Sequence, residues 1–395
     1  MKQFILEHRE EDVRQLALQA SRYPEIDMPY ALTQIAGWQS LRDKVPSWAE
    51  HQEIIYPQHL SLEQCSSEQT ALYKQQIVKE TGKKTDAFTD LTGGFGIDCS
   101  FIGKLFKKAT YVERQESLCQ IASHNFQELG LNHISVCNDD ANTYLQQASP
   151  CDWIFIDPAR RNDHGGKTVA ISDCEPDVGE LEALLVAKAT KVMVKLSPML
   201  DLSLALQQLK HVEEVHIISV NNECKELLLL LSNDCLTDIE RTPIHCVNIQ
   251  KEIIQHLLFT RAEEHRLSDH YAHEIGKYLY EPNASLMKAG AFKCLAFHYQ
   301  VEQLQANSHL YTSEKLVRDF PGRIFEVEAF SKFGKKDLKA LLAGITKANL
   351  SVRNFPSSVS ELRKRLHIAE GGDTYLFATT FHPQEKVLIR CKKQI

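Results

Sequence analysis

One loop and two later acidic residues have the types and spacing needed to bind a nucleoside. Asp90-Leu-Thr-Gly-Gly-Phe-Gly96 follows a short apolar run and leads into a segment with helical spacing. Glycines suit a backbone that turns sharply against a ligand, although a turn without a ligand is the alternative. Glu113, 20 residues after Gly93, ends a second expected strand, where a carboxylate can accept both ribose hydroxyls. Asp140 follows a third strand, where it can accept from an adenine amino group. We expect these three strand ends to converge.

The loop favours a nucleoside without phosphate. A dinucleotide site needs another glycine three residues after Gly96, where Cys99 stands, and the sequence has no Gly-Lys-Ser/Thr phosphate loop. S-adenosyl-L-methionine has no phosphate and carries two cationic groups, which suit an acidic loop. Asp90 is expected to hold its ammonium group. The residues expected to bind this cofactor are Asp90, Thr92, Gly93, Gly94, Phe95, Gly96, Glu113, Asp140 and Asp157.

These residues resemble a known family. The loop 90–96, Glu113, Asn138-Asp-Asp140 and Asp157-Pro-Ala-Arg-Arg161 are similar to the first four motifs of class I S-adenosylmethionine-dependent methyltransferases, over residues 65–235. The whole chain resembles bacterial class I methyltransferases with a C-terminal THUMP-like domain. The segments that carry this closer resemblance are Glu63-Gln-Cys-Ser-Ser-Glu68, Asp157–Arg161, Asn222-Glu-Cys-Lys-Glu226 and Ser351-Val-Arg-Asn-Phe-Pro356. THUMP domains bind RNA in their families, so the resemblance implies an RNA or nucleotide substrate.

The resemblance places catalysis at Asp157-Pro158, after the fourth strand. In amino-methylating families this motif is Asp/Asn-Pro-Pro-aromatic, whose first side chain accepts from the target amine and whose aromatic ring stacks on the base. Here Ala159 and Arg160 replace the last two residues. A guanidinium can stack on a base or bind phosphate, or it can form a structural ion pair. We therefore expect Asp157, Pro158 and Arg160 to be catalytic, with Asp157 as a base if one is needed. Further substrate contacts are expected from Arg161, Lys195 and a closing loop at 165–167.

The hydrophobic pattern predicts an α/β fold with a Rossmann-like, seven-stranded, mostly parallel sheet. The expected strands are 87–91, 109–112, 134–137, 153–156, 192–196, 215–220 and 226–231, with helices at 97–106, 118–129, 181–189 and 202–209. The last two strands are too close for a crossover helix, so they pair antiparallel or splay apart. We expect a helical region at 1–80, in which Ser66 and Gln69 form a capping box, and the methyltransferase domain at 81–235.

The remaining residues predict a connector and small α+β domain at 236–321 and a THUMP-like, ferredoxin-like domain at 322–395. A strand is expected at 244–249, and a helix at 286–297 capped by Asn283 or Ser285. The second domain is expected to follow the order β-α-β-α-β-β. Its strands are 322–329, 350–354, 374–380 and 386–391, and its helices are 335–343 and 359–366.

Charge is uneven along the chain. The net charge is −7, which excludes a uniformly basic nucleic-acid binder, but residues 276–395 carry 19 Lys and Arg against 11 Asp and Glu. The rest carries 26 against 41, so a polyanion is expected to dock at the C-terminal end. Lys335, Lys336 and Arg353 are the expected contacts, and a solvated basic face is the alternative. The 11 cysteines lack Cys-x-x-Cys spacing, and no signal peptide or membrane span is visible, which predicts a reduced, cytoplasmic protein without metal.

The sequence therefore predicts an enzyme that transfers a methyl group from S-adenosylmethionine to RNA by in-line displacement. Two alternatives remain: methylation of a small molecule or protein with the C-terminal domain as a lid, and an RNA-binding module that retains the cofactor fold without turnover. Cys224 could attack a pyrimidine carbon with Lys225 lowering its pKa, although a buried filler is the commoner role of a cysteine.

Overall fold

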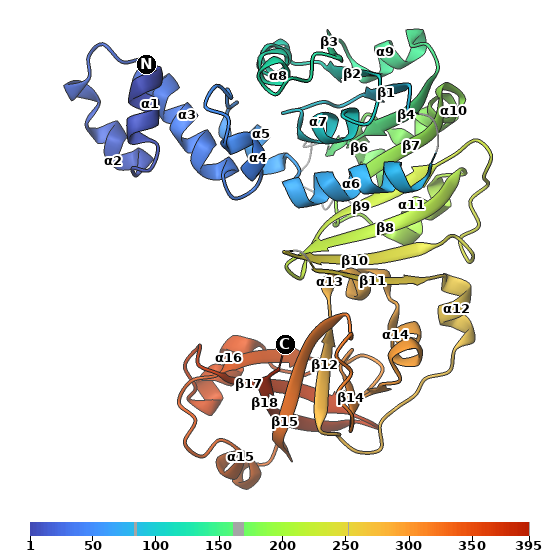
Figure 1. Ribbon diagram of the computed structural model, residues 1–395. Coiled ribbons are helices and arrows are strands. Elements are labelled where there is room, and N and C mark those ends of the chain that lie inside the picture. Colours follow the sequence, from blue (N-terminus) through green and yellow to red (C-terminus); the bar gives the residue numbers. More distant parts are fainter. Residues whose placement is uncertain (83–84, 161–169, 252, 395) are drawn as a thin grey trace. The chain divides into compact units, whose positions relative to one another are not determined.

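A computed structural model describes residues 1–82, 85–160, 170–251 and 253–394 of the chain (Figure 1). It divides into two compact units. Unit 1 consists of Met1–Glu214 and Leu227–Thr237, and unit 2 of Val215–Glu226 and the residues from Asp238 onward. The division passes through two neighbouring strands, so each unit is described by itself. No helix among the described residues is long and apolar enough to cross a membrane.

Unit 1 begins with short helices, as predicted for residues 1–80. They are α1 (Lys2–His8), α2 (Val13–Leu18), η1 (Ala20–Arg22), α3 (Met28–Leu41), α4 (Pro46–Ala49), α5 (His59–Gln64) and α6 (Glu68–Glu80). The predicted capping box is wrong by one residue. Ser67, not Ser66, caps α6, because its hydroxyl accepts from Thr70 N. The hydroxyl of Ser66 instead donates to the buried carboxylate of Asp98.

The predicted seven strands are all present, in a sheet with the order β11-β10-β8-β9-β7-β4-β1-β2-β3 (Figure 1). The seven are β1 (Ala87–Asp90), β2 (Lys108–Glu113), β3 (Ile134–Asn138), β4 (Cys151–Ile156), β7 (Ala189–Leu196), β8 (Val212–Val220) and β9 (Glu223–Leu231). Strands β3, β2, β1, β4 and β7 pair in parallel, and β9 is antiparallel to β7. Residues 153–156 form a continuous buried apolar run, as expected for a sheet covered on both faces.

The connections between these strands are mostly helical. They contain α7 (Ile97–Gly103), α8 (Glu116–Glu128), α9 (Ala141–Gln147), α10 (Val178–Lys188) and α11 (Leu202–Gln208). Helix α9 was not predicted. Beyond β4 lie the two-stranded pair β5 (Ala159–Arg160) and β6 (Cys174–Glu175), with η2 (Ile171–Asp173). Strands β8 and β9 are joined by Asn221 and Asn222, both at positive φ, the conformation of a tight hairpin turn.

Two further strands extend the sheet within unit 2. Strand β10 (Ile244–Gln250) pairs in parallel with β8, and β11 (Ile253–Phe259) pairs antiparallel with β10. The first of these strands was expected within a connector, and the second was not predicted. Strand β11 lies at the edge of the sheet, where Ile253, Ile254 and Leu258 are exposed, so its apolar residues do not alternate regularly with polar ones.

The rest of unit 2 holds a second sheet with the order β13-β14-β12-β15-β18-β17-β16. Its first elements are α12 (Arg261–Arg266), β12 (Tyr278–Pro282), α13 (Ala284–Ala289), α14 (Phe292–Tyr299), β13 (Glu302–Gln303) and β14 (Tyr311–Ser313). The predicted single helix over 286–297 is wrong, because the chain takes the left-handed conformation at Gly290 and two helices result. Asn283 caps the first of them, as expected.

From residue 322 the predicted order β-α-β-α-β-β is confirmed. The elements are β15 (Gly322–Lys332), α15 (Lys335–Leu341), β16 (Asn349–Arg353), α16 (Val359–Leu366), β17 (Thr374–Phe381) and β18 (Glu385–Lys393). One core cluster contains Leu338 of α15, Leu362 of α16 and Leu376 of β17. The two helices therefore pack together on one face of the sheet. A second cluster, around Phe325 and Phe377, includes no residue of either helix.

In unit 1 the N-terminal helices and the segment after them are attached to the sheet region by specific contacts. The ring of Trp48 meets that of Phe95 edge to face, with centroids 5.1 Å apart. The side-chain amide of Asn125 in α8 accepts from Ile55 N and donates to Ile55 O, both over 2.9 Å. Phe95 belongs to the glycine loop, so this packing helps to position the loop.

Candidate active site

The glycine loop 90–96 is shaped by close contact with Tyr111. A Cβ atom on Gly93 would lie 2.1 Å from the Tyr111 ring, so no larger residue fits there. Gly94 and Gly96 have φ of +53° and +90°, which favour glycine. The Tyr111 hydroxyl donates to Gly94 O over 2.5 Å, and burial raises the pKa of Tyr111, so this donor keeps its proton. The loop is thus held in one conformation against the end of β2.

Glu113, the last residue of β2, contacts this loop directly. Its Oε2 accepts from Gly94 N over 3.0 Å, and its Oε1 accepts from Gln115 N over 2.9 Å. Two backbone donors therefore fix the orientation of the carboxylate at the end of the strand. The arrangement suits a group that presents two acceptor oxygens to a pair of hydroxyls.

Asp140 lies just beyond the end of β3, as the sequence analysis expected. Its Oδ1 accepts from Asn142 N and Thr143 N, so the side chain caps α9. The preceding Asn138 donates to Glu113 O over 2.9 Å, which ties the ends of β3 and β2 together. Oδ1 of Asp140 is thus used to cap α9. The contact of Asp140 with adenine stays a prediction.

Asp90, at the end of β1, is a buried carboxylate with an unusual environment. It is 1% exposed, and the hydrogen bond found for its side chain in the described part of the chain comes from Thr92 N, over 3.0 Å. Burial raises the pKa of Asp90 well above its ordinary value, and the negative charges of Asp98 and Asp157 raise it further. A cationic ligand beside Asp90 would offset this cost.

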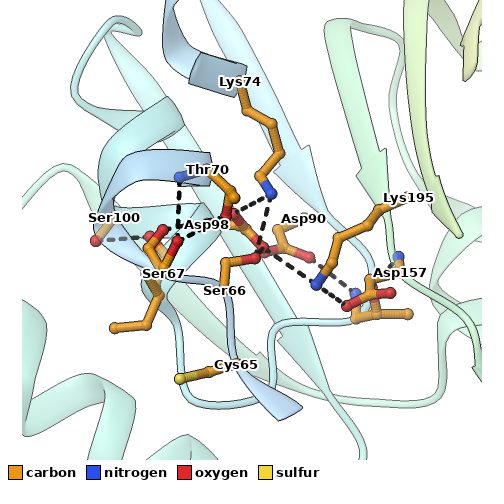
Figure 2. A network of polar contacts seen from close by, with 12 residues as sticks. Cys65, Ser66, Ser67, Thr70, Lys74, Asp90, Asp98, Ser100, Asp157 and Lys195 are labelled. Atoms are coloured by element: carbon orange, nitrogen blue, oxygen red, sulfur yellow. Dashed lines mark hydrogen bonds and ion pairs between the residues drawn. The ribbon is translucent and has the colours of Figure 1, made fainter. Parts of the chain in front are cut away.

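Asp98, in the first turn of α7, lies at the centre of a polar network (Figure 2). Its carboxylate pairs with Lys74 Nζ over 3.1 Å and with Lys195 Nζ over 3.7 Å, and it accepts from Ser66 Oγ over 2.6 Å. Figure 2 shows both lysine side chains pointing toward it. Burial acts to raise the pKa of Asp98, but the two lysines outweigh it and hold the pKa below its ordinary value. Asp98 is therefore ionised at neutral pH.

The same network reaches the predicted catalytic segment. Lys195 Nζ, at the end of β7, donates to Asp157 Oδ2 over 2.5 Å, and Asp157 N donates to Thr92 Oγ1 over 2.7 Å. The side chain of Asp157 is 34% exposed, whereas Lys195 is 11% exposed. Asp157 is thus bound to the glycine loop through its backbone and to Lys195 through its carboxylate, with part of its surface open to a substrate.

Other predicted site residues have different surroundings. Phe95 is buried against Trp48, so only its backbone is available to a ligand. Pro158 is buried, and the backbone of Arg160 pairs with Cys174 in the short β5–β6 ladder. Arg161 and the expected loop at 165–167 lie outside the described residues.

The predicted substrate contacts of the C-terminal domain separate into two groups. Lys335 and Lys336, at the start of α15, are exposed. The guanidinium of Arg353 instead pairs with Glu281, whose side chain is 2% exposed, over 2.9 Å. Arg353 therefore has a structural partner inside unit 2. Cys224 is a poor nucleophile, because burial raises the pKa of its thiol, and Lys225 pairs with Glu223 instead.

Lys74 and Asp98 were not among the predicted site residues. The sequence contains a signal for Lys74: residues 70, 71, 74, 77 and 78 form the buried stripe of α6, and a lysine in such a stripe needs an acidic partner. Nothing in the sequence identifies that partner as Asp98, which is 24 residues away on another helix.

Comparison with known proteins identifies the family. A ferredoxin-like domain matches residues 278–321, and a THUMP domain-like family matches residues 322–393. A crystal structure described as a "putative methyltransferase from Porphyromonas gingivalis W83" is 36% identical in sequence, with a TM-score of 0.88. The match covers 100% of this chain and 97% of that one. The chain belongs to the same family, the class I S-adenosylmethionine-dependent methyltransferases with a THUMP-like C-terminal domain.

More distant solved structures match only part of this methyltransferase. An rRNA methylase from Streptococcus thermophilus is 13% identical, with a TM-score of 0.32, over 40% of this chain and 94% of its own. TrmK from M. capricolum, bound to S-adenosyl-homocysteine, is 12% identical, with a TM-score of 0.32, over 42% of this chain and 70% of its own. Matches this weak add nothing to the argument. No curated protein matches the chain significantly.

The cofactor of this methyltransferase is S-adenosylmethionine, and the residues described above fit it. The glycine loop leaves its backbone open beside Glu113, whose two oxygens suit a ribose. Asp90 is a buried acid whose other neighbours include Asp98, Asp157 and Glu113, so the site favours a cation and disfavours phosphate. The cofactor supplies an activated methyl group. The assignment of individual residues to its parts is a proposal.

Proposed function

We propose that this methyltransferase acts on RNA, and that its site joins cofactor and substrate through Asp157. The RNA substrate is supported by the THUMP domain-like match over residues 322–393. The role of Asp157 is supported by the pair of contacts that it makes, to Thr92 in the glycine loop and to Lys195 at the end of β7. Groups that bind the cofactor and groups that face the substrate are thereby held in one geometry, as positioning catalysis requires.

Lys195 acts on Asp157 by fixing its carboxylate. The ion pair occupies Oδ2, so Oδ1 can accept a hydrogen bond from the group to be methylated. Lys195 is in turn held by Asp98, which Lys74 and Ser66 orient from the other side. The nucleophile's lone pair forms the bond to the methyl carbon as the carbon–sulfur bond breaks, and Asp157 takes the nucleophile's proton where there is one to lose.

RNA docking is assigned to the basic helices α15 and α16 in unit 2. Their exposed basic residues, with one preceding residue, are Lys332, Lys335, Lys336, Lys339, Lys364 and Arg365. The guanidinium of Arg365 lies over the Phe333 ring, 5.0 Å from its centroid, so the end of α16 and the start of α15 form one surface. Phe330 is 50% exposed and offers a ring on which a base can stack.

The domain boundaries at 80, 235 and 321 are part of the same proposal. Residues 81–235 carry out methyl transfer, residues 322–395 bind RNA, and residues 1–80 and 236–321 support them. We assign the reaction to the reducing cytoplasm because none of the eleven cysteines forms a disulfide, and six of them are buried in the interior as thiols.

The experiment is transfer of label from methyl-tritiated S-adenosylmethionine by the purified full chain. The acceptors are total RNA, total protein and small metabolites from cells that lack the protein, and nucleosides from labelled RNA are analysed by mass spectrometry. We expect label in RNA with the parent protein and none with Asp157→Ala. Label in the protein or metabolite fraction alone would overturn the RNA assignment while leaving the enzyme assignment intact.

A further inference from the structure

One buried carboxylate in unit 2 holds two arginines. Glu281 of β12 has a side chain that is 2% exposed, and it pairs with Arg323 of β15 and with Arg353 at the end of β16. Arg323 Nε donates to Glu281 Oε2 over 2.6 Å, and Arg353 Nη2 donates to Glu281 Oε1 over 2.9 Å. Each oxygen of the carboxylate therefore binds a different arginine.

The three side chains meet because the second sheet is strongly curved. Glu281 and Arg323 are direct register partners, whereas β16 lies four strands away from β12 in the order β12-β15-β18-β17-β16. In a flat sheet, four steps of about 4.8 Å would separate the two strands by roughly 19 Å. Because Arg353 contacts Glu281 directly, the sheet must curl, with these side chains on its inner face.

The inner face is opposite to the face that carries helices α15 and α16. Arg353 is the register partner of Thr379, which lies two residues after Phe377 on the same face of the sheet. The ring of Phe377 packs against that of Phe325, with centroids 4.9 Å apart. The neighbouring Leu376 points the other way, into the core cluster formed with the two helices. The arginine pair is therefore separate from the basic surface of α15 and α16.

The two arginines keep donors for a second anion. Basic side chains outnumber the acid by one in this cluster, and Arg323 and Arg353 are 34% and 36% exposed. Their contacts with Glu281 use Nε and Nη2, and no partner for Nη1 of either arginine is found within the described residues. A guanidinium that is bound along one edge can present the other edge to a phosphate, whose oxygens match its planar fork.

Two buried polar atoms near Arg353 also lack a partner. His309 Nδ1 and Thr379 Oγ1 are both inaccessible, and neither forms a hydrogen bond with any residue that the structure describes. Burial lowers the pKa of His309, and the nearby Arg353 guanidinium lowers it further. Unsatisfied buried polar atoms are uncommon in native proteins, and a bound ion is one physical reason for them. These atoms add an independent sign that this face of the sheet is built around a ligand.

We propose that Arg323 and Arg353 bind one phosphate group, on the side of their guanidiniums that faces away from Glu281. Glu281 holds both guanidiniums in place, so little side-chain freedom is lost when the ligand binds. The phosphate belongs to RNA or to a free nucleotide. The inference rests on the proposed function only in naming RNA as one of these two sources.

The test is calorimetry of the full chain with inorganic phosphate and with AMP, at an ionic strength held constant with chloride. Fluorescence anisotropy with a labelled oligoribonucleotide measures RNA binding by the same proteins. We expect the parent to bind one phosphate, and Arg323→Gln to weaken this binding by about tenfold or more, the scale of lost charge-assisted hydrogen bonds. Arg323→Lys keeps the charge but lacks the fork, so it should also bind phosphate more weakly than the parent.

The matched control is Arg241→Gln, which removes an arginine of unit 2 that is 85% exposed and pairs with Asp238. It should bind phosphate like the parent. Circular dichroism and melting temperature check folding, and Arg353 still pairs with Glu281 in both Arg323 variants. If Arg323→Gln does not fold, Arg323→Lys decides.

The RNA measurement identifies the source of the phosphate. A parallel loss of phosphate and RNA affinity in Arg323→Gln would support the proposal with RNA as the source, and a loss of phosphate and AMP affinity alone would support it with a free nucleotide. No phosphate binding by the parent, or equal binding by the parent and a folded Arg323 variant, would overturn it. A failure to methylate RNA would overturn the proposed function and leave phosphate binding intact.

Discussion

Lys195 donates to Asp157 over 2.5 Å across the ends of two strands that are adjacent in the sheet, β7 and β4. The same ammonium group lies 3.7 Å from Asp98, so one lysine serves two carboxylates. Lys74, fully buried, supplies the second positive charge. Two lysines and two acids thus form a cluster beside Asp90 in which basic and acidic side chains are equal in number.

Replacing Asp157 with alanine should separate binding from transfer. The backbone N–H at this position still donates to Thr92, so cofactor affinity should change less than about threefold. Transfer should fall at least about 100-fold, the scale of a lost acid–base group. Calorimetry with S-adenosylmethionine and the tritium assay measure the two effects. Equal turnover by parent and variant would remove Asp157 from the mechanism.

Asp98→Asn should destabilise unit 1 strongly, because it leaves two lysines of the buried cluster without their shared acid. The expected loss is about 3–5 kcal/mol in the free energy of unfolding at pH 7. The folded pKa of Asp98 is lowered, so its stabilisation is present above the unfolded pKa and lost as pH falls through the folded pKa. Urea unfolding at pH 7 and at about pH 2, below the ordinary aspartate pKa, should therefore show a smaller difference from the parent at the lower pH.

The control for Asp98 is Asp86→Asn. Asp86 pairs with Lys107 on the surface, where the two side chains are 53% and 80% exposed, and such exposed pairs contribute little to stability. A loss at Asp98 no larger than at Asp86 would contradict the buried-cluster interpretation.

Asp90→Asn should stabilise the protein while weakening cofactor binding. Burial raises the folded pKa of Asp90 above its unfolded value, so ionising it opposes folding, and the stability held by its protonated form is lost as pH rises through the folded pKa. The variant should melt higher than the parent at pH 8, with the gap closing toward pH 4. Weaker binding of S-adenosylmethionine by the same variant would indicate that Asp90 contributes to function at a cost in stability. A melting temperature of the variant below that of the parent at pH 8 would contradict this prediction.

Glu113→Gln should weaken the binding of S-adenosylmethionine by about 1–3 kcal/mol, the size of lost charge-assisted hydrogen bonds. The substitution preserves an acceptor for Gly94 N, so the loop itself should keep its shape. Glu116→Gln, an exposed acid at the start of α8, is the matched control. If both variants give the parent dissociation constant by calorimetry, the ribose assignment fails.

Lys335→Gln with Lys336→Gln should flatten the salt dependence of RNA binding. Each phosphate contact to a single strand contributes a slope of about 0.7 in a plot of log affinity against log salt, so losing two should reduce the slope by roughly 1.4. The control removes two equally exposed lysines of β18, Lys392 and Lys393. An identical change in the control would attribute the effect to net charge instead of to a docking surface.

The central strands could be predicted because they are buried on both faces and therefore read as continuous apolar runs, as in Trp153–Ile156. Helix α9 was missed because only Ala141 and Leu145 are buried in it, too few to show a helical period. Asp140 indicated the start of this helix, because aspartate is a common N-cap, but it was interpreted only as a residue that binds the cofactor. Edge strand β11 was missed for the related reason that its burial pattern is irregular.

The candidate site could be predicted only in the part formed by residues that lie close together in the sequence or at a known spacing. The glycine loop and Glu113 follow from local spacing, and the structure places them in contact. The ion pairs of Asp98 with Lys74 and Lys195 connect residues 24 and 97 positions apart, so tertiary packing alone selects these partners. Arg353 was predicted from the basic region around it, and that region gives no sign of its partner, the buried Glu281. Its contact with a substrate stays a prediction.

The edge-to-face contact between Trp48 and Phe95 bears on how shortened versions of this protein would behave. A fragment that starts at the first strand would expose Phe95 to water and leave Asn125 facing solvent where Ile55 had been. Such a fragment would retain every residue predicted to bind the cofactor. It would still bind the cofactor poorly, because the packing that supports the glycine loop would be lost. Dissection of the enzyme should therefore keep its first eighty residues.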